Sequence, residues 1–318
     1  MMKQPLILVL SSVDDPQLRM LEGLPHILVN SADALSEEAK HAEVIMHWFG
    51  PRDLLENSFK VCKKVRWVHS RSAGLDSVLF PELVQSPVPL TNGSGVFSQS
   101  LGEFALAAIL YFAKDFRRML RNQEAGRWEQ FDVEEISGQT VGIVGYGDIG
   151  RAVASRTHAM GMRVLGLKRH PPTTSDPFID QFYKTPELTS MLGQCDYVVV
   201  AAPLTAETHH MISDAAFAAM KPNAVVINIG RGPVIDQAAL IRALSQGKIK
   251  GAGLDVFEKE PIPEGDPIYK FENVLISPHC ADHTKDWLNQ AMEFFILQYE
   301  RFSKGQPLEN VVEKHLGY

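Results

Sequence analysis

The sequence is poor in cysteine, lacks a run of basic residues and has no long apolar segment. Its 318 residues include three cysteines, Cys62, Cys195 and Cys280, which are odd in number and far apart. This usage excludes a disulfide framework and indicates a reducing compartment. The 31 lysines and arginines are outnumbered by 38 acidic residues, which gives a formal net charge of −7. A nucleic-acid partner is therefore not expected.

The apolar segments are too short to cross a membrane. The longest one in the body of the chain, Phe104 to Ala113, is well below the roughly 20 residues that a spanning helix needs. Near the start, Leu6–Leu10 is followed by the polar residues Ser11–Asp15 and not by a small-residue cleavage site. We interpret it as a strand rather than a secretion signal. We expect a cytoplasmic protein with no membrane partner.

Short apolar strands alternate with helical stretches from Leu6 to Leu90, which is typical of a parallel sheet covered by helices. The expected strands are Leu6–Leu10, Ile27–Val29, Glu43–His47, Trp67–His69 and a short one near Pro89. The expected helices are Gln17–Glu22, Ala34–His41, Arg52–Phe59 and Asp76–Val84. This part of the chain carries no phosphate-binding motif of its own.

A second unit follows the loop Asn92–Gly95, beginning with one long helix over Ser98–Glu124. Six strands are expected: Thr140–Val144, Arg163–Leu167, Tyr197–Ala201, Ala224–Asn228, Gly251–Asp255 and Val274–Ile276. Helices are expected between them, at Gly150–Met160, Pro186–Leu192, Asp214–Met220 and Asp236–Gln246, with Asp236 as an N-cap and Gly247 just beyond the C-terminus. A final helix, Trp287–Phe302, leads into the C-terminal tail.

The most informative motif lies between the first strand and first helix of the second unit. Gly145, Gly147 and Gly150 match the spacing G-x-G-x-x-G. In such a motif the first glycine allows the turn, the second lets a pyrophosphate approach the backbone, and the third lets the helix pack on the strand. The helix N-terminus offers N–H donors to phosphates. The segment therefore predicts a dinucleotide site made by Gly145, Tyr146, Gly147, Asp148, Ile149 and Gly150.

These elements predict an α/β protein with two doubly wound parallel-sheet domains. A Rossmann-type nucleotide domain, residues 99–284, is inserted into a flavodoxin-like substrate domain made of residues 1–98 and 285–318. The tail is expected to return to the first domain because that domain precedes the nucleotide fold.

Ligand-binding residues of a doubly wound sheet lie at the carboxyl ends of its strands. After the second strand, where an acidic residue normally binds the ribose 2′-hydroxyl, the chain has Lys168 and Arg169. Basic residues there favour a 2′-phosphate and so NADP(H) over NAD(H), although solvated side chains would explain them too. The loop after Tyr197–Ala201 could line the adenosine side of the site.

Three later strand-end loops carry groups suited to catalysis. Arg231 lies between two glycines and could bind a carboxylate with its guanidinium fork. His279 follows the last strand and could transfer a proton, with a nearby carboxylate such as Glu260 orienting its ring. Each residue alone also has a structural explanation, but their occurrence at successive strand ends favours an active site. No metal site is expected.

These segments together resemble the D-isomer-specific 2-hydroxyacid dehydrogenase family. The matching segments are Val141–Gly150, Pro203–Thr205 with Thr208, Asn228–Asp236, Gly253–Phe257, Glu260–Pro261 and Ser277–His279. The resemblance implies an NAD(P)-dependent oxidoreductase that transfers a hydride between the cofactor and a small 2-keto or D-2-hydroxy acid.

By that resemblance, Arg231 would bind the substrate, His279 would be the general acid, and Glu260 would keep His279 protonated. Backbone N–H groups of Ala73 and Gly74 would bind the substrate carboxylate. Without the resemblance, this loop is interpreted as an ordinary turn between a strand and a helix. The cofactor contacts implied beyond the glycine motif are Lys168, Arg169, Ala202, Pro203, Thr208, Ile229, Gly230 and, on the nicotinamide side, Asp255.

The sequence departs from the family pattern in three places. Lys168-Arg169 replace the usual acid, Ala201 stands where a histidine is frequent, and Asp282 lies in a loop that usually has small residues. A glyoxylate or hydroxypyruvate reductase using NADPH is the first expectation, and a homodimer is expected because the segment around Trp128 forms dimer contacts in similar proteins.

The alternative functions considered for this sequence belong to other classes of protein. One is a nucleotide-sensing binding protein of dehydrogenase fold without turnover, which Arg231, Glu260 and His279 disfavour. A nucleophilic Cys280 is also disfavoured, because the neighbouring His279 is better explained as part of a cofactor-dependent active site. A metal site at His209-His210 is disfavoured because the two histidines have no cysteine partner nearby.

Overall fold

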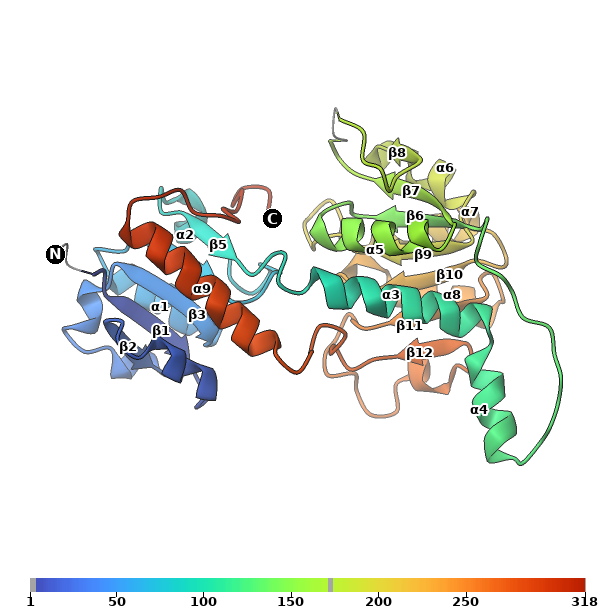
Figure 1. Cartoon of the computed structure of the whole chain (residues 1–318), viewed down its shortest axis with the longest axis horizontal. Coiled ribbons are helices and arrows are strands. Elements are labelled where there is room, and N and C mark those ends of the chain that lie inside the picture. The colour runs from blue at the N-terminus through green and yellow to red at the C-terminus, as the bar shows by residue number, and fades with distance from the viewer. Residues whose placement is uncertain (1–3, 171–173, 318) are drawn as a thin grey trace. The chain divides into compact units, whose positions relative to one another are not determined.

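The computed structural model describes residues 4–170 and 174–317 and divides into two compact units. One unit contains the chain up to Phe97 and again from Lys285, and the other spans Ser98–Thr284. Each has its own parallel sheet with helices (Figure 1). The expected fold class, two parallel-sheet α/β domains, is confirmed.

The first unit has a five-stranded parallel sheet in the order β2-β1-β3-β4-β5. Its strands are β1 Ile7–Ser11, β2 His26–Val29, β3 Val44–Phe49, β4 Trp67–Ser70 and β5 Leu90–Asn92. This order is that of flavodoxin-like sheets. Its helices are α1 Arg52–Val61, α2 Pro81–Gln85 and the C-terminal α9 Trp287–Ser303. In α9, Phe295 stacks on Trp67 and the Tyr299 hydroxyl donates to the Pro5 carbonyl at 2.6 Å, which fixes the returning segment to this unit.

Three helices expected in the first unit are wrong in extent or type. The 17–22 region is the 3-10 segment η1 Pro16–Leu21, and the 34–41 region holds two 3-10 turns, η2 Ala32–Ala34 and η3 Ala39–His41. The 76–84 region becomes helical only at Pro81. The reason is local, because a proline disfavours helical geometry in the residue before it, and Phe80 is accordingly extended (φ −138°, ψ 158°).

The second unit has a seven-stranded parallel sheet in the order β12-β11-β10-β9-β6-β7-β8. Its strands are β6 Thr140–Val144, β7 Arg163–Leu167, β8 Gln181–Tyr183, β9 Tyr197–Val200, β10 Val225–Asn228, β11 Gly251–Leu254 and β12 Val274–Ile276. The expectation of six strands is wrong because the short edge strand β8 was missed. The order reverses between β6 and β9, the topological switch point at which doubly wound sheets bind ligands.

The helices of the second unit either precede β6 or lie between its later strands. They are α3 Ser98–Ala113, α4 Phe116–Glu124, α5 Asp148–Ala159, α6 Leu188–Leu192, α7 Asp214–Ala219 and α8 Gln237–Ser245, with the 3-10 turns η4 Thr185–Glu187, η5 Gly232–Val234 and η6 Pro267–Lys270. The predicted cap is confirmed, since the Asp236 carboxylate accepts the Ala239 N–H at 2.9 Å. Gly247 follows α8 at a φ of +62°, as expected of a helix C-terminus.

The single helix expected over Ser98–Glu124 is two helices. Asp115 adopts a left-handed conformation (φ 48°, ψ 50°) and its carboxylate accepts the Arg118 N–H at 3.3 Å, so it caps α4. Aspartate tolerates this conformation better than most residues. Within the described residues, neither this helix pair nor any other helix is long and apolar enough to cross a membrane.

Candidate active site

The glycine turn between β6 and α5 is closely packed on one side and open on the other. Gly145 has a φ of +97°, and a Cβ there would lie 2.5 Å from the Ala202 Cα. A Cβ on Gly150 would collide with the Gly145 carbonyl oxygen. A Cβ on Gly147, in contrast, would meet no atom within 4 Å. Gly145 and Gly150 are therefore required by packing, whereas Gly147 leaves space beside the N-terminus of α5, which fits a phosphate group.

The strand ends around the switch point approach each other through their backbones. A Cβ on Gly230, after β10, would lie 2.7 Å from the Ala202 carbonyl oxygen, after β9. Ala202 and Ile229 are both buried. The structure thus brings Gly145, Ala202 and Gly230 together, as a cofactor site at the switch point requires, while their cofactor contacts remain a prediction.

Tyr146, the variable residue inside the glycine motif, is a packing residue in this structure. It is buried, and its ring meets Phe182 of β8 edge-on with 5.1 Å between centroids. Burial raises the pKa of Tyr146, and the nearby Asp176 carboxylate raises it further. Its side chain therefore stays neutral and packs toward the edge strand.

The basic pair after β7 has a partner that the sequence interpretation missed. Arg169 Nη2 lies 2.5 Å from Glu207 Oε2, on the loop after β9. Lys168 donates its backbone N–H to the Tyr183 carbonyl at 3.0 Å, which fixes the start of this loop. Nothing in the sequence pattern pairs residues 169 and 207, because the contact depends on β7 and β9 flanking β6.

The loop after β9 is shaped by two threonines. Thr208 Oγ1 donates to the Pro203 carbonyl at 2.6 Å and accepts the Thr205 N–H at 2.8 Å. The Thr208 N–H also donates to the Thr205 carbonyl at 3.2 Å. Thr208 and Pro203 therefore hold a tight turn, and any contact of theirs with a cofactor remains a prediction.

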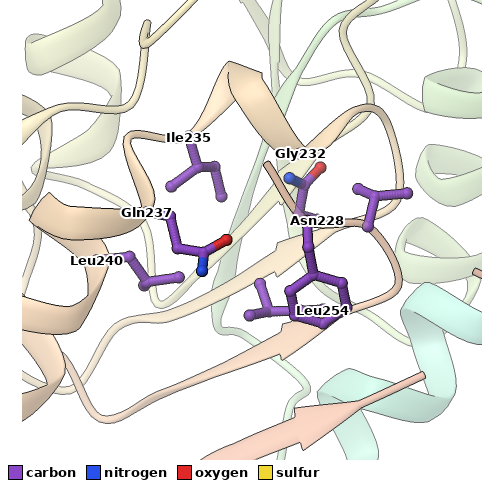
Figure 2. Close-up of a pocket in the computed structure, with 8 residues that line it drawn as sticks. Asn228, Gly232, Ile235, Gln237, Leu240 and Leu254 are labelled. Atoms are coloured by element: carbon purple, nitrogen blue, oxygen red, sulfur yellow. The ribbon is translucent and has the colours of Figure 1, made fainter. Parts of the chain in front are cut away.

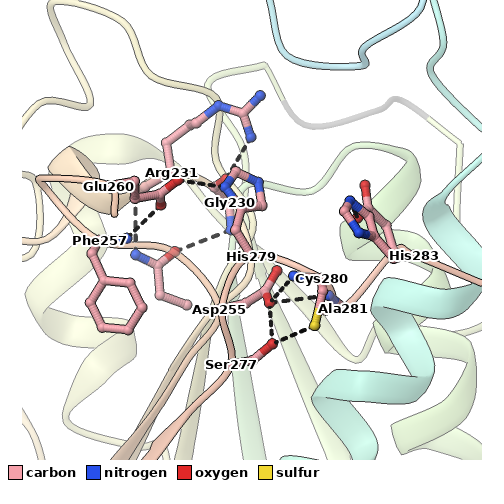
Figure 3. A network of polar contacts seen from close by, with 12 residues as sticks. Gly230, Arg231, Asp255, Phe257, Glu260, Ser277, His279, Cys280, Ala281 and His283 are labelled. Atoms are coloured by element: carbon pink, nitrogen blue, oxygen red, sulfur yellow. Dashed lines mark hydrogen bonds and ion pairs between the residues drawn. The ribbon is translucent and has the colours of Figure 1, made fainter. Parts of the chain in front are cut away.

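His279 and Glu260 are paired. His279 Nδ1 lies 2.6 Å from Glu260 Oε2, and Glu260 Oε1 accepts the Phe257 N–H at 2.8 Å (Figure 3). The two side chains are 42% and 34% exposed, so the group is accessible to a ligand. Because Nδ1 faces the carboxylate, Nε2 is the nitrogen left to exchange a proton.

Arg231 belongs to the same group of side chains (Figure 3). The buried Asn228 amide holds its turn, accepting the Gly230 N–H and donating to the Arg231 carbonyl, each at 3.1 Å. Arg231 Nη1 donates to the Gly230 carbonyl at 2.9 Å. A Cβ on Gly232 would collide with the Phe257 backbone, so only glycine lets the Arg231 loop pack against the loop that leads to Glu260.

Asp255 has a role that sequence reasoning did not find. It is 1% exposed, and its Oδ1 accepts the Ser277 hydroxyl at 2.6 Å and the N–H groups of Cys280 and Ala281 at 3.0 and 3.1 Å. These bonds hold the loop in which His279 adopts a left-handed backbone (φ 52°). Asp255 therefore positions His279, while its predicted contact with the nicotinamide side remains a prediction.

A small pocket lies at the ends of β10 and β11, beside Asn228 and Gly232 (Figure 2). Its volume is about 10 Å³, close to the least that holds one water molecule, and so too small for a substrate. It is lined by Asn228, Gly232, Ile235, Gln237, Leu240, Leu254, Val256 and Phe257.

The predicted carboxylate-binding loop belongs to the first unit. The Ala73 carbonyl accepts Asn92 Nδ2 at 2.7 Å, and the Gly93 N–H donates to the Ser72 carbonyl at 3.3 Å. Ala73 and Gly74 are partly exposed. Among the described residues no group of three or more histidine, cysteine, aspartate or glutamate side chains is arranged to hold a metal ion.

Comparison with known proteins identifies the class. Residues 106–281 match the family model for the NAD-binding domain of D-isomer specific 2-hydroxyacid dehydrogenases. The chain is 35% identical over 302 residues to glyoxylate/hydroxypyruvate reductase B of Enterobacter sp., covering 90% of each, and 34% identical over 264 residues to glyoxylate reductase of Korarchaeum cryptofilum, covering 81% and 79%. It belongs to the D-isomer specific 2-hydroxyacid dehydrogenase family.

Solved structures agree with this assignment. A D-isomer specific 2-hydroxyacid dehydrogenase from Xanthobacter autotrophicus Py2, in complex with NADPH and MES, superposes with a TM-score of 0.86 at 30% identity, covering 99% of this chain and all of the other. An NADPH-dependent glyoxylate/hydroxypyruvate reductase from Sinorhizobium meliloti, in complex with NADP and sulfate, gives 0.85 at 26% identity with the same coverage. The chain is thus an NAD(P)-dependent oxidoreductase of the 2-hydroxyacid dehydrogenase type.

Proposed function

We propose that this enzyme reduces glyoxylate or hydroxypyruvate, with NADP(H) preferred over NAD(H). The observation that carries the proposal is the group formed by Arg231 and the 2.6 Å His279–Glu260 pair. The names of the relatives, glyoxylate reductase and glyoxylate/hydroxypyruvate reductase, support the choice of substrate.

Each residue of this group has a role that follows from its chemistry. Arg231 binds the substrate carboxylate or carbonyl oxygen through its guanidinium. His279 donates a proton from Nε2 to the carbonyl oxygen during reduction and accepts one in the reverse direction. Glu260 stabilises the imidazolium and orients the ring. Backbone N–H groups of Ala73 and Gly74 are proposed to bind the substrate carboxylate.

The cofactor, when bound, supplies the hydride. The open space at Gly147 and the N-terminus of α5 fit its phosphates, and Lys168 and Arg169 are proposed to bind a 2′-phosphate. Related structures in complex with NADPH or NADP support this preference.

A homodimer is proposed from exposed apolar residues on α4 and the segment after it. Phe116, Met119 and Leu120 are 42%, 41% and 55% exposed, and Trp128 is 96% exposed. Large apolar side chains gathered in this way mark protein–protein contacts. Sedimentation at several concentrations tests the proposal, and Leu120→Asp combined with Trp128→Ala should yield monomers. A wild-type protein that sediments as a monomer at all concentrations contradicts it.

A direct assay tests the proposed reaction. NADPH and NADH oxidation are followed by absorbance with glyoxylate, hydroxypyruvate, pyruvate and larger 2-keto acids. Turnover with the two short acids and faster reaction with NADPH support the proposal. Tight cofactor binding with no turnover on any acid would instead identify a nucleotide-binding protein without catalysis.

A further inference from the structure

We propose that Glu207 controls the choice between NADPH and NADH by competing with the cofactor 2′-phosphate for Arg169. The inference rests on the proposed cofactor site, and it adds a residue outside the segments that predicted that site. Its basis is the ion pair between Arg169 Nη2 and Glu207 Oε2 at 2.5 Å.

The two side chains of this ion pair differ in solvent exposure. Arg169 is 27% exposed and lies directly after β7, whereas Glu207 is 64% exposed. An exposed ion pair of this kind contributes only about 0–1 kcal/mol to stability. The pair is therefore weak enough for a ligand with a stronger anionic group to displace the carboxylate.

The backbone that presents Glu207 is well fixed. The turn from Thr205 to Thr208 is closed by the Thr205 N–H bond to Thr208 Oγ1 at 2.8 Å and by the His209 N–H bond to the Thr205 carbonyl at 3.0 Å. Glu207 is the acidic residue of this turn and extends to the basic loop after β7. No acidic residue follows β7 directly, where dinucleotide-binding folds usually have one. The loop after β9 supplies Glu207 at this place instead.

The charges predict opposite effects on the two cofactors. A phosphate monoester carries about −1.5 to −2 charges at pH 7 and makes strong paired hydrogen bonds with arginine. It must displace the Glu207 carboxylate and is repelled by it. A ribose hydroxyl carries no charge and can donate to that carboxylate while the ion pair stays intact. Glu207 therefore weakens NADPH binding and supports NADH binding, so that both cofactors remain usable.

The test measures the Kd of NADPH and of NADH from the fluorescence of the reduced nicotinamide in wild type and Glu207→Gln. The variant should bind NADPH about three- to tenfold more tightly, with a gain that shrinks at 1 M salt, because the change removes a nearby like charge. NADH should bind with equal or about two- to fivefold lower affinity. Glu264→Gln, an exposed residue of the same unit, is the charge-matched control and should change neither Kd.

An NADPH-to-NADH affinity ratio in Glu207→Gln equal to that of wild type and Glu264→Gln overturns the inference. Arg169→Gln separates this failure from that of the cofactor assignment. If Arg169→Gln leaves NADPH binding unchanged, the proposed 2′-phosphate site is wrong. If it weakens NADPH binding while Glu207→Gln leaves the ratio unchanged, the site stands and only the role of Glu207 is wrong.

Discussion

His279 Nδ1 and Glu260 Oε2 lie 2.6 Å apart although 19 residues separate them in the chain. The carboxylate contacts one ring nitrogen and so orients the imidazole. Glu260 is held in turn by the Phe257 N–H. The pair therefore leaves the other ring nitrogen, Nε2, facing away from the carboxylate, as the proposed proton transfer requires.

Removing either partner should lower turnover without affecting cofactor binding. General acid–base catalysis contributes about 10²–10⁴-fold, so His279→Ala should lower kcat by that factor. Glu260→Gln keeps an acceptor for Nδ1 but removes the charge, and should cost about 10–100-fold. Steady-state kinetics and NADPH titration check both. Turnover by His279→Ala at the wild-type rate would reject His279 as the acid.

The glycines of the turn should respond differently to alanine. At Gly147 a Cβ meets no atom within 4 Å, so Gly147→Ala should keep the wild-type Tm but weaken cofactor binding about tenfold or more by filling the phosphate space. Gly145→Ala should unfold at lower temperature, because its φ is +97° and the Cβ would contact Ala202. Thermal unfolding and cofactor titration are measured on both. Unchanged NADPH affinity in a folded Gly147→Ala protein would contradict the phosphate site.

Asp255 should affect catalysis through the loop it holds. Asp255→Ala removes the acceptor for Ser277, Cys280 and Ala281 and frees the His279 backbone, so kcat should fall by more than about 100-fold, as expected for a misplaced catalytic group. Asp255→Asn retains an oxygen acceptor and should be less impaired. Ser277→Ala removes one of the three bonds and serves as the mild control. Equal activity of Asp255→Ala and Ser277→Ala would rule out this positioning role.

Asp196 should make the second unit sensitive to acid. Burial disfavours its charge, but the Thr140 N–H at 2.9 Å and the Lys221 ammonium at 2.9 Å outweigh burial and lower its pKa. The stabilising contribution of the Asp196 charge is therefore complete above a pH of about 3.9, the pKa of aspartate in the unfolded chain. It is lost as the pH falls through the lower pKa that Asp196 has in the folded protein.

The matched comparison is Asp196→Asn against Asp132→Asn, an exposed residue of the same unit. At pH 7, Asp196→Asn should lower the free energy of unfolding by about 1 kcal/mol, and this difference from wild type should shrink below about pH 4. Urea unfolding at pH 7, 5 and 3 measures it. A difference that stays constant down to pH 3 would show that the charge of Asp196 does not contribute.

The local sequence pattern was sufficient to predict many strands and helix ends of the second unit. Thr140–Val144 and the Asp236 cap agree with prediction because apolar runs and capping side chains act over a few residues. Pattern failed at β8, whose three residues carry too little signal, and at Asp115, where one left-handed residue divides a helix whose apolar spacing continues across it.

The sequence by itself determined the two α/β units, the glycine turn and the dehydrogenase family, because these depend on short-range spacing of glycines and apolar residues. Only the tertiary structure decided which charged groups meet. Arg169 pairs with Glu207, 38 residues away, and Asp255 holds the loop that carries His279, because the strand order brings the ends of distant strands to one edge of the sheet. Such contacts follow from the order of the strands in the sheet, which the local sequence pattern does not indicate.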